Sequence, residues 1–297
     1  MSNKPRKMTL GKKHNLTGWA FLAPATFLIA VFSFWPMIKA LVLSFQTGKG
    51  RNMQMAGFTN YIRMFQDDVF IQSIKNTFFY FILQVPIMLV VAMVLACILN
   101  KKDLRFKGFF RTMIFLPCTT SLVAYSIIFR SLFANDGLVN YVLVNIGILD
   151  KPYNFLTQPF AAKMVIILGL LWRWTGYNMV FFLSGLQNIE YSVYEAAKID
   201  GASAIQTFFK ITVPLLKPTI LLTAIMSTNG TLQLFDESIN LTDGGPANAS
   251  ISMSHYIYNL CFKYVPNFGY AAAMSFFILL LVAVLAFIQM RVGDKRD

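Results

Sequence analysis

The chain has 297 residues, of which 56% are hydrophobic and only 13% are charged. A soluble domain usually has about 25% charged residues, so this composition excludes a water-soluble enzyme and a disordered chain and indicates a protein that lies mostly in lipid. The net charge of +13 comes from 26 lysine and arginine residues against 13 acidic residues. Such an excess is typical either of a nucleic-acid-binding protein or of a membrane protein with basic cytoplasmic loops.

Six apolar runs have about the 20-residue length that crosses a hydrocarbon core of about 30 Å. They cover residues 16–45, 77–99, 113–133, 164–186, 219–241 and 270–290. Because backbone polar groups in lipid must be satisfied within their own segment, each run is predicted to be a helix. We therefore expect an all-α integral membrane protein of six transmembrane helices, with a basic tail over 1–15, a six-span domain over 16–291 and a short tail over 292–297.

The basic residues lie mainly on one side of this predicted membrane domain. Sixteen of the 26 fall in the N-terminal tail, in two alternate loops and after the sixth run, whereas the opposite loops hold five. Cytoplasmic loops are enriched in lysine and arginine, so both termini are expected in the cytoplasm. No basic stripe is left outside these loops, and nucleic acid is therefore not an expected partner.

The longest cytoplasmic loop, over 187–217, is predicted to contain two short helices. Ser192 and Glu195 have the spacing of a capping box, with the serine as N-cap. Good helix formers follow, and Asp200-Gly201 ends the helix because glycine supplies a left-handed C-terminal residue.

The second helix of this loop has a similar start. Ser203 and Gln206 repeat the capping-box spacing, and Pro214 and Pro218 then end the segment and lead into the fifth span. A helix–turn–helix on a cytoplasmic face presents a protruding surface, which predicts a partner protein that receives it.

The residues of this loop form a recognisable pattern. The pattern is Glu195-Ala196-Ala197-x-x-Asp200-Gly201-Ala202, followed by Phe208-x-x-Ile211-x-x-Pro214-x-x-x-Pro218. It resembles the EAA motif of the permease subunits of bacterial binding-protein-dependent ABC importers. The six spans and the later segment Leu241-Thr242-Asp243-Gly244-Gly245-Pro246 are similar to the sugar-uptake branch, which includes maltose and multiple-sugar permeases.

The resemblance implies a type I ABC importer permease fold in the bacterial plasma membrane and a set of partners. These are a second related permease, two cytoplasmic ATPase subunits that bind ATP-Mg, an extracytoplasmic sugar-binding protein and an oligosaccharide or other sugar as cargo. The chain has no Gly-x-x-x-x-Gly-Lys-Ser/Thr motif, so we expect no cofactor, no metal and no catalysis of its own.

The resemblance also implies which loop residues couple to the ATPase. They are Glu195, Ala196, Ala197, Asp200, Gly201, Ala202, Phe208 and Pro214. For Glu195 two interpretations stay open, an ionic contact to a basic ATPase residue and a purely structural helix cap.

Polar residues inside the fourth predicted span indicate a site within the membrane. Arg173 lies near the middle of this span, where a charge costs about 2.5–3.5 kcal/mol on insertion scales and usually faces a cavity or a partner. It either lines the substrate path or forms an ion pair with Asp236 or Glu237. The neighbouring aromatic residues Trp172 and Tyr177 either stack on sugar rings or pack in the bundle.

The fifth span is unusually polar. Asn229, Gln233 and Asp236 have the spacing of one helical face, and Gly230 allows close approach of a helix or a ligand. Such polarity must look into the bundle or a water-filled path. The predicted substrate path is formed by Trp172, Arg173, Gly176, Tyr177, Asn178, Asn229, Gln233 and Asp236.

Two rival functions remain at this point. A permease of the same type could carry a non-sugar solute such as a phosphorylated polyol, although an anionic cargo favours several cations in the path. A membrane-embedded enzyme would need a catalytic cluster, but the two histidines, His14 and His255, are isolated in the sequence.

Overall fold

A computed structural model describes residues 10–48, 52–101 and 103–293. Parts of both predicted tails, residues 1–9 and 294–297, lie outside the described residues, as do residues 49–51 and 102. The regular secondary structure of the described residues is helical apart from one short antiparallel hairpin, in which β1 (Gln46–Thr47) pairs with β2 (Gln54–Met55). Four of its helices are long and apolar enough to cross a membrane, and two bent helix pairs raise the number of spans to six.

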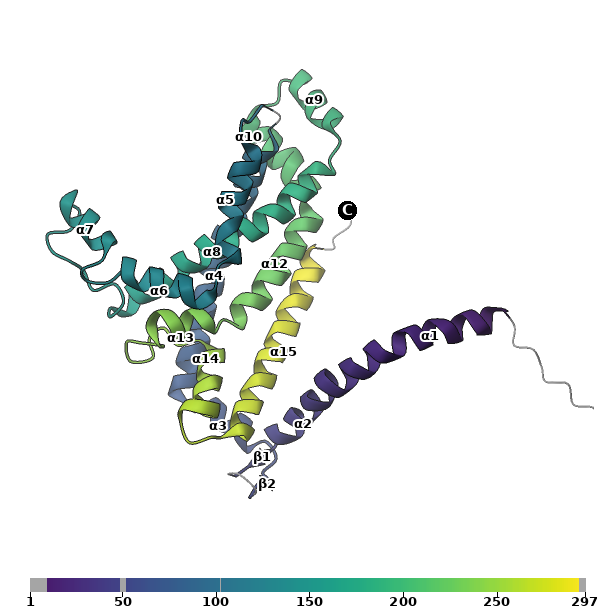
Figure 1. The fold of residues 1–297 in the computed structure, drawn as a ribbon, viewed down its shortest axis with the longest axis vertical. Coiled ribbons are helices and arrows are strands. Elements are labelled where there is room, and N and C mark those ends of the chain that lie inside the picture. Colours follow the sequence, from purple (N-terminus) through teal and green to yellow (C-terminus); the bar gives the residue numbers. More distant parts are fainter. Residues whose placement is uncertain (1–9, 49–51, 102, 294–297) are drawn as a thin grey trace, which may run out of the picture.

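Four helices form the bundle: α4 (Asp68–Asn100), α8 (Pro159–Gln187), α12 (Lys217–Leu232) and α15 (Phe268–Gly293) (Figure 1). The 33 residues of α4 give a helix of about 50 Å, longer than the hydrocarbon core. This helix therefore begins well before residue 77, where the apolar run starts. Asp67 caps it by accepting hydrogen bonds from the backbone N–H groups of Val69 and Phe70 at 3.0 and 3.2 Å.

The pair α4 and α8 packs through small and large residues that alternate across the contact. Ala92 and Ala96 of α4 are fully buried in one cluster with Met179 and Phe182 of α8. Small residues let two membrane helices approach closely, which increases the van der Waals contact that holds them together.

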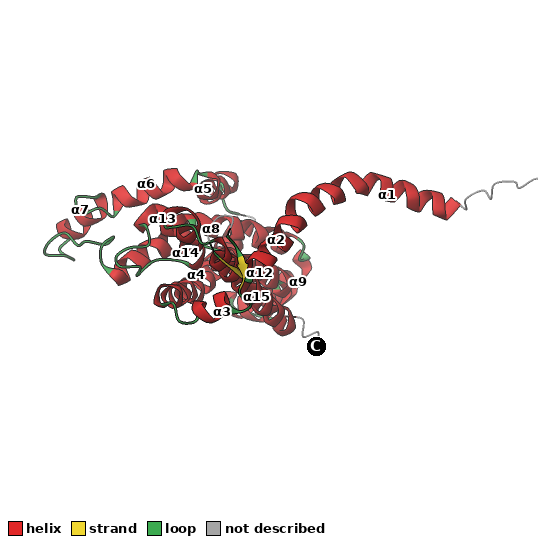
Figure 2. Cartoon of the chain, turned by 90° about the horizontal axis from the view of Figure 1, so that it is seen from below, coloured by secondary structure: helices red, strands yellow, loops and turns green. Residues whose placement is uncertain are grey.

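The first span leaves this bundle. It consists of α1 (Leu10–Ile29), a π-helical turn (Ala30–Phe34) and α2 (Trp35–Ser44), and α1 projects far from the other helices (Figures 1 and 2). Pro36 lacks the N–H that would bond the carbonyl of Phe32, which explains the wider π turn before it. None of the most apolar stretch of this span is buried within the chain.

The third predicted span, 113–133, is not a single helix. It divides into α5 (Lys107–Thr119) and α6 (Leu122–Leu132), which are bent by 97°. The hydroxyls of Thr119 and Thr120 bond the carbonyls of Leu116 and Pro117, at 2.8 and 2.7 Å. These local bonds compete with the helix ladder, and Pro117 removes one further backbone donor.

The fifth predicted span, 219–241, is also interrupted. Helix α12 ends at Leu232, residues 233–235 are not helical, and α13 (Asp236–Thr242) follows. Asp236 and Glu237 fall in the first turn of α13, where acidic side chains interact favourably with the helix dipole. The prediction that Asn229, Gln233 and Asp236 share one continuous helical face is therefore wrong for Asp236.

Short helices lie at the two ends of the bundle. At one end are α9 (Tyr191–Ile199), α10 (Ala204–Thr207), a π-helical turn (Phe208–Thr212) and α11 (Val213–Leu215). At the other are α3 (Thr59–Met64), α14 (Met253–Tyr258) and a π-helical turn (Asn259–Lys263), while α7 (Leu138–Asn145) extends to the side beyond α6 (Figure 1). The positive-inside rule makes the α9 end cytoplasmic.

Candidate functional site

A cavity of about 300 Å³ lies inside the bundle where the two interrupted spans meet α4 and α8. Leu122 at the start of α6 and the nonhelical residues Gln233, Leu234 and Phe235 all line it. The breaks in the third and fifth spans therefore lie directly at this cavity, because nonhelical backbone at membrane depth is tolerated where it lines a cavity or is buried in protein.

Four of the eight predicted path residues line this cavity: Tyr177, Asn178, Gln233 and Asp236. Asn178 is held in place by three contacts. Its amide nitrogen donates to the Trp174 carbonyl at 3.0 Å and lies 3.5 Å from the Met88 sulfur, and its oxygen accepts from the Ser227 hydroxyl at 3.3 Å. The side chain is thus oriented by α4, α8 and α12 together.

Other cavity residues were not predicted. Gln84 of α4 is almost fully buried, and its oxygen accepts a hydrogen bond from the Thr231 hydroxyl at 2.9 Å. Trp174 packs edge-on against Tyr177, with ring centroids 5.8 Å apart. A glutamine within the second apolar run, 77–99, is a sequence signal for an inward-facing polar site.

The acidic residues of α13 form one wall of the cavity. Asp236 and Glu237 both line it, and Glu237 is only 4% exposed. None of the residues that line the cavity is a lysine or an arginine. The lining therefore combines amides, hydroxyls, three aromatic side chains and two carboxyl groups.

Arg173 does not line the cavity. Its guanidinium donates to the carbonyl oxygen of Thr120 at 2.7 Å and lies over the ring of Tyr125 at 5.2 Å. Among the described residues it has no carboxylate within 4.0 Å, so the ion pair with Asp236 or Glu237, one of the two alternatives for this residue, is not present. Instead, Arg173 satisfies a backbone carbonyl that the break in the third span has freed.

Three further predicted path residues also lie elsewhere. A Cβ atom on Gly176 would overlap the carbonyl of Ile114, so this glycine permits the close contact of α8 with α5. Trp172 packs against Tyr125 and Phe129 at centroid distances of 6.1 and 5.6 Å. Asn229 accepts a hydrogen bond from Gln233 and does not itself line the cavity.

The cytoplasmic loop folds into the coupling segment, which we define as residues 187–217. Its first helix, α9, begins at Tyr191 with Glu190 as N-cap. The predicted capping box of Ser192 with Glu195 is therefore wrong, and the Ser192 hydroxyl instead donates to the Glu190 carboxylate at 3.3 Å. Glu195 is exposed on α9 and free to meet a partner.

The turn after α9 closes as the sequence predicted. Gly201 has a φ of +75°, the Ala202 N–H donates to the Ala197 carbonyl at 2.9 Å, and the Gly201 N–H donates to the Lys198 carbonyl at 3.2 Å. These two bonds define a Schellman motif, for which glycine is the preferred left-handed residue. The predicted capping box of Ser203 and Gln206 is confirmed, with both reciprocal hydrogen bonds formed.

The coupling segment exposes apolar side chains. Ile199, Ile205 and Phe209 are 85%, 71% and 65% exposed, whereas Ala197 is buried and Phe208 packs against the core at the cytoplasmic end. Of the predicted coupling residues, Ala197 and Phe208 thus anchor the segment to the bundle. Pro214 lies in the first turn of α11, before the 71° bend into α12.

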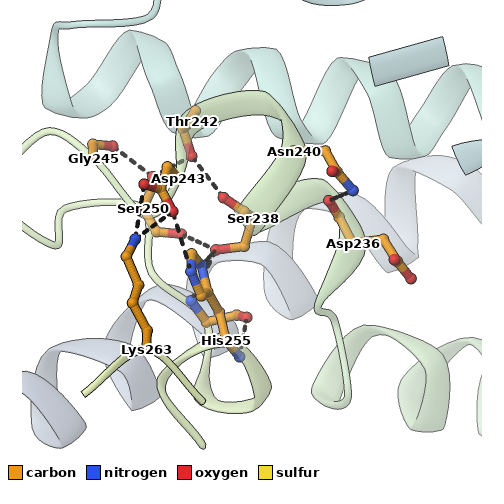
Figure 3. Close-up of polar contacts among 10 residues, drawn as sticks. Asp236, Ser238, Asn240, Thr242, Asp243, Gly245, Ser250, His255 and Lys263 are labelled. Atoms are coloured by element: carbon orange, nitrogen blue, oxygen red, sulfur yellow. Dashed lines mark hydrogen bonds and ion pairs between the residues drawn. The ribbon is translucent and has the colours of Figure 1, made fainter. Parts of the chain in front are cut away.

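At the outer end, hydrogen bonds join α13 to α14 (Figure 3). The hydroxyl of Ser238 lies 2.9 Å from His255 Nδ1, and the carboxylate of Asp243 lies 3.7 Å from His255 Nε2 and 2.9 Å from Lys263. Burial of the His255 ring lowers its pKa to about 4; Asp243 opposes this shift and Lys263 adds to it. The imidazole is therefore neutral at pH 7. No group of three His, Cys, Asp or Glu side chains suited to hold a metal occurs among the described residues.

Comparisons with known proteins agree with this architecture. The model of the family described as binding-protein-dependent transport system inner membrane component matches residues 68–296. The lactose transport system permease protein of Rhizobium radiobacter is 51% identical over 292 residues, covering 98% of each chain. An arabinooligosaccharides transport system permease protein of Halalkalibacterium halodurans is 31% identical over 96% of this chain and 90% of the relative.

A solved structure also shares the fold. A chain of a bacterial alginate ABC transporter, in complex with an alginate pentasaccharide-bound periplasmic protein, superimposes with a TM-score of 0.83 at 26% identity. The match covers 95% of this chain and 96% of that chain. The similarity includes the first span, which lies outside the residues that the family model matches.

Proposed function

The chain belongs to the family of binding-protein-dependent transport system inner membrane components, and from this premise we propose that it is the subunit of a bacterial sugar importer that forms half of the path for a neutral carbohydrate. It is a multi-pass permease of the inner membrane. The proposal concerns its cargo, the residues that meet the cargo and its individual partners.

The composition of the cavity supports a neutral sugar. Asn178, Gln84 and Gln233 offer amide groups that can donate to and accept from hydroxyls, while Trp174 and Tyr177 offer aromatic faces. A small number of polar groups in an otherwise apolar cavity is the usual design of a small-molecule site. The name of the relative from Rhizobium radiobacter suggests lactose as the first cargo to test.

The lining of the cavity argues against an anionic cargo. Asp236 and Glu237 line it without any lysine or arginine, so no cationic side chain there would balance the charge of a phosphorylated polyol. Arg173, the one basic residue in the predicted substrate path, does not serve such a cargo because its guanidinium already donates to the Thr120 carbonyl.

Three surfaces of the chain are suited to the three kinds of protein partner that we propose. The exposed apolar residues of the coupling segment fit a cleft on an ATPase subunit, two of which hydrolyse ATP for the assembled importer. The first span, unburied in this chain, supplies a face for a second, related permease subunit. The outer loops around α7 and α14 face the extracytoplasmic side, from which a sugar-binding protein delivers the cargo.

The test is uptake of labelled lactose by cells that carry the chain together with its partner subunits. The double variant Gln84→Leu, Asn178→Leu replaces two amide side chains of the cavity by leucine, which has a similar size. We expect uptake to fall by at least about tenfold, since each lost hydrogen bond to the cargo contributes about 1 kcal/mol. The control is Asn52→Leu, Gln66→Leu, which changes two exposed amides outside the bundle. Equal uptake by both variants at equal membrane levels contradicts the proposed site.

A further inference from the structure

A second cavity, of about 1010 Å³, lies at the cytoplasmic end of the bundle. One wall is formed by the last turns of α4 and the residues that follow it, and the other by the coupling segment from Gln187 to Thr212. It shares no residue with the smaller cavity in the middle of the bundle, so it is a separate site.

The polarity of this cavity changes along α4. Val94 and Ile98 line it and are 42% and 43% exposed, and Asn100 and Lys101 line it where the helix ends. At 1.5 Å per residue, Val94 and Lys101 are separated by about 10 Å along the helix axis. The cavity is therefore apolar toward the membrane interior and polar toward the cytoplasm.

The polar end of the cavity favours an anion. Lys101 and Lys198 reach it from opposite walls, and within the described residues neither lysine forms an ion pair within 4.0 Å. Asp103 is the one acidic residue among those that line it, and the side chains of Tyr191 and Tyr194 add phenol groups.

We propose that this cavity binds an anionic phospholipid of the cytoplasmic leaflet. The lipid phosphate lies between Lys101 and Lys198, and an acyl chain lies against Val94 and Ile98. A phospholipid has its charged head and apolar tail in the order that the cavity requires, at the depth where α4 leaves the hydrocarbon core. Basic pockets between membrane helices on the cytoplasmic side bind such headgroups.

A free phosphate ion and a protein surface fit this cavity less well. Phosphate would leave the exposed faces of Val94 and Ile98 uncovered. A partner protein would have to reach into a space walled by a membrane-spanning helix. A bound lipid would instead connect α4 to the coupling segment, and this inference does not depend on which sugar is carried.

The experiment measures lipid retention by native mass spectrometry of the purified full-length chain in detergent, with phosphatidylglycerol or phosphatidylcholine added. Wild type is expected to retain phosphatidylglycerol in preference. The variant Lys101→Gln, Lys198→Gln should bind it about thirtyfold more weakly, because each basic residue at the membrane surface contributes about a factor of five to binding.

The matched control is Lys107→Gln, Lys210→Gln. It removes the same charge from the same two regions, but neither residue lines the cavity, and we expect less than about a twofold loss. A second variant, Val94→Asn with Ile98→Asn, tests the apolar half and should also weaken lipid retention while the chain remains monodisperse.

Four results would overturn the proposal. Equal losses in the two lysine variants would show only general attraction to the anionic surface. Displacement of the lipid by millimolar inorganic phosphate would show a simple anion site. Retention of phosphatidylglycerol by the Lys101→Gln, Lys198→Gln variant would place the lipid elsewhere, and its loss on addition of the ATPase partner would assign the cavity to that interface.

Discussion

The unbroken spans and the interrupted spans of this protein have different structural roles. Helices α4, α8 and α15 run without a break and pack through small and apolar residues. The third and fifth spans are broken at residues 120–121 and 233–235. Leu122, directly after the first break, and all three residues of the second line the central cavity. The continuous helices therefore build the bundle, whereas the interrupted ones bring polar groups to its interior.

Each break needs a partner for the backbone groups that it frees. The Thr120 carbonyl accepts from Arg173, and the Leu234 carbonyl accepts from the hydroxyl of Ser252. Unsatisfied backbone groups in a membrane protein cost several kcal/mol. Side chains from other helices thus make the breaks possible, and variants of these side chains test the distinction between the two kinds of span.

The largest effect on stability is expected at the contact between α8, which is continuous, and α5, which belongs to the interrupted third span. Gly176→Val places a branched side chain against the Ile114 backbone of α5, and we expect a loss of about 3 kcal/mol in the free energy of unfolding from overpacking. Thermal unfolding in detergent measures it. Gly230→Ala is the control, since a Cβ there meets nothing within 4 Å; similar destabilisation by the two variants would contradict the close contact.

The second largest effect is expected when Arg173, the hydrogen-bond donor at the break of the third span, is removed. Arg173→Leu leaves the Thr120 carbonyl unpaired, and we expect about 2 kcal/mol of destabilisation together with loss of sugar uptake. Arg130→Leu, on the exposed face of α6, serves as control. If Arg173 instead binds cargo, the variant will lose uptake but keep the unfolding temperature of the wild-type protein.

A smaller effect on stability is expected in the coupling segment that continues into the fifth span. Gly201→Val forces a β-branched residue to a φ of +75°, at a cost of about 1–2 kcal/mol, and it adds bulk at the docking surface. We expect the assembled importer to hydrolyse ATP without matching uptake. Gly201→Asn is the control, because asparagine tolerates the left-handed conformation, and it should stay closer to wild type.

The last effect appears only at low pH and concerns the outer end of the fifth span. The pKa of His255 is about 4 in the folded chain, below its usual value of about 6.5. Its contribution to stability is therefore complete above pH 6.5 and is lost as the pH falls toward 4. Protease resistance of the segment from α13 to α14 should decline over this range in wild type. It should decline less in His255→Asn, and His14→Asn should behave as wild type.

The sequence predicted the parts of the site that depend on neighbouring residues. Gly201 was expected in a left-handed turn and Ser203 in a capping box, and both are present because each depends on residues within a few positions. Ser192 was assigned to the wrong cap because Glu190, two residues earlier, begins the helix. Such boundary errors arise where two polar residues compete for one helix start.

The path residues were harder to predict, because hydropathy shows that a polar residue faces inward but not what it meets. Arg173 and Gly176 are inward-facing, yet one meets a carbonyl 53 residues away and the other meets the backbone of α5. Gln84, which does line the cavity, bonds Thr231 across 147 residues. No local pattern encodes contacts of that separation.

The sequence alone therefore determined the membrane environment, the orientation of the chain and the helix–turn–helix of the coupling segment. Hydropathy, charge bias and turn chemistry are properties of short stretches and act before the helices meet. The tertiary structure decided where the third and fifth spans break, which polar side chains satisfy the freed carbonyls and which four predicted residues reach the cavity. These outcomes depend on packing, since a polar group in lipid is stable only when another helix supplies its partner.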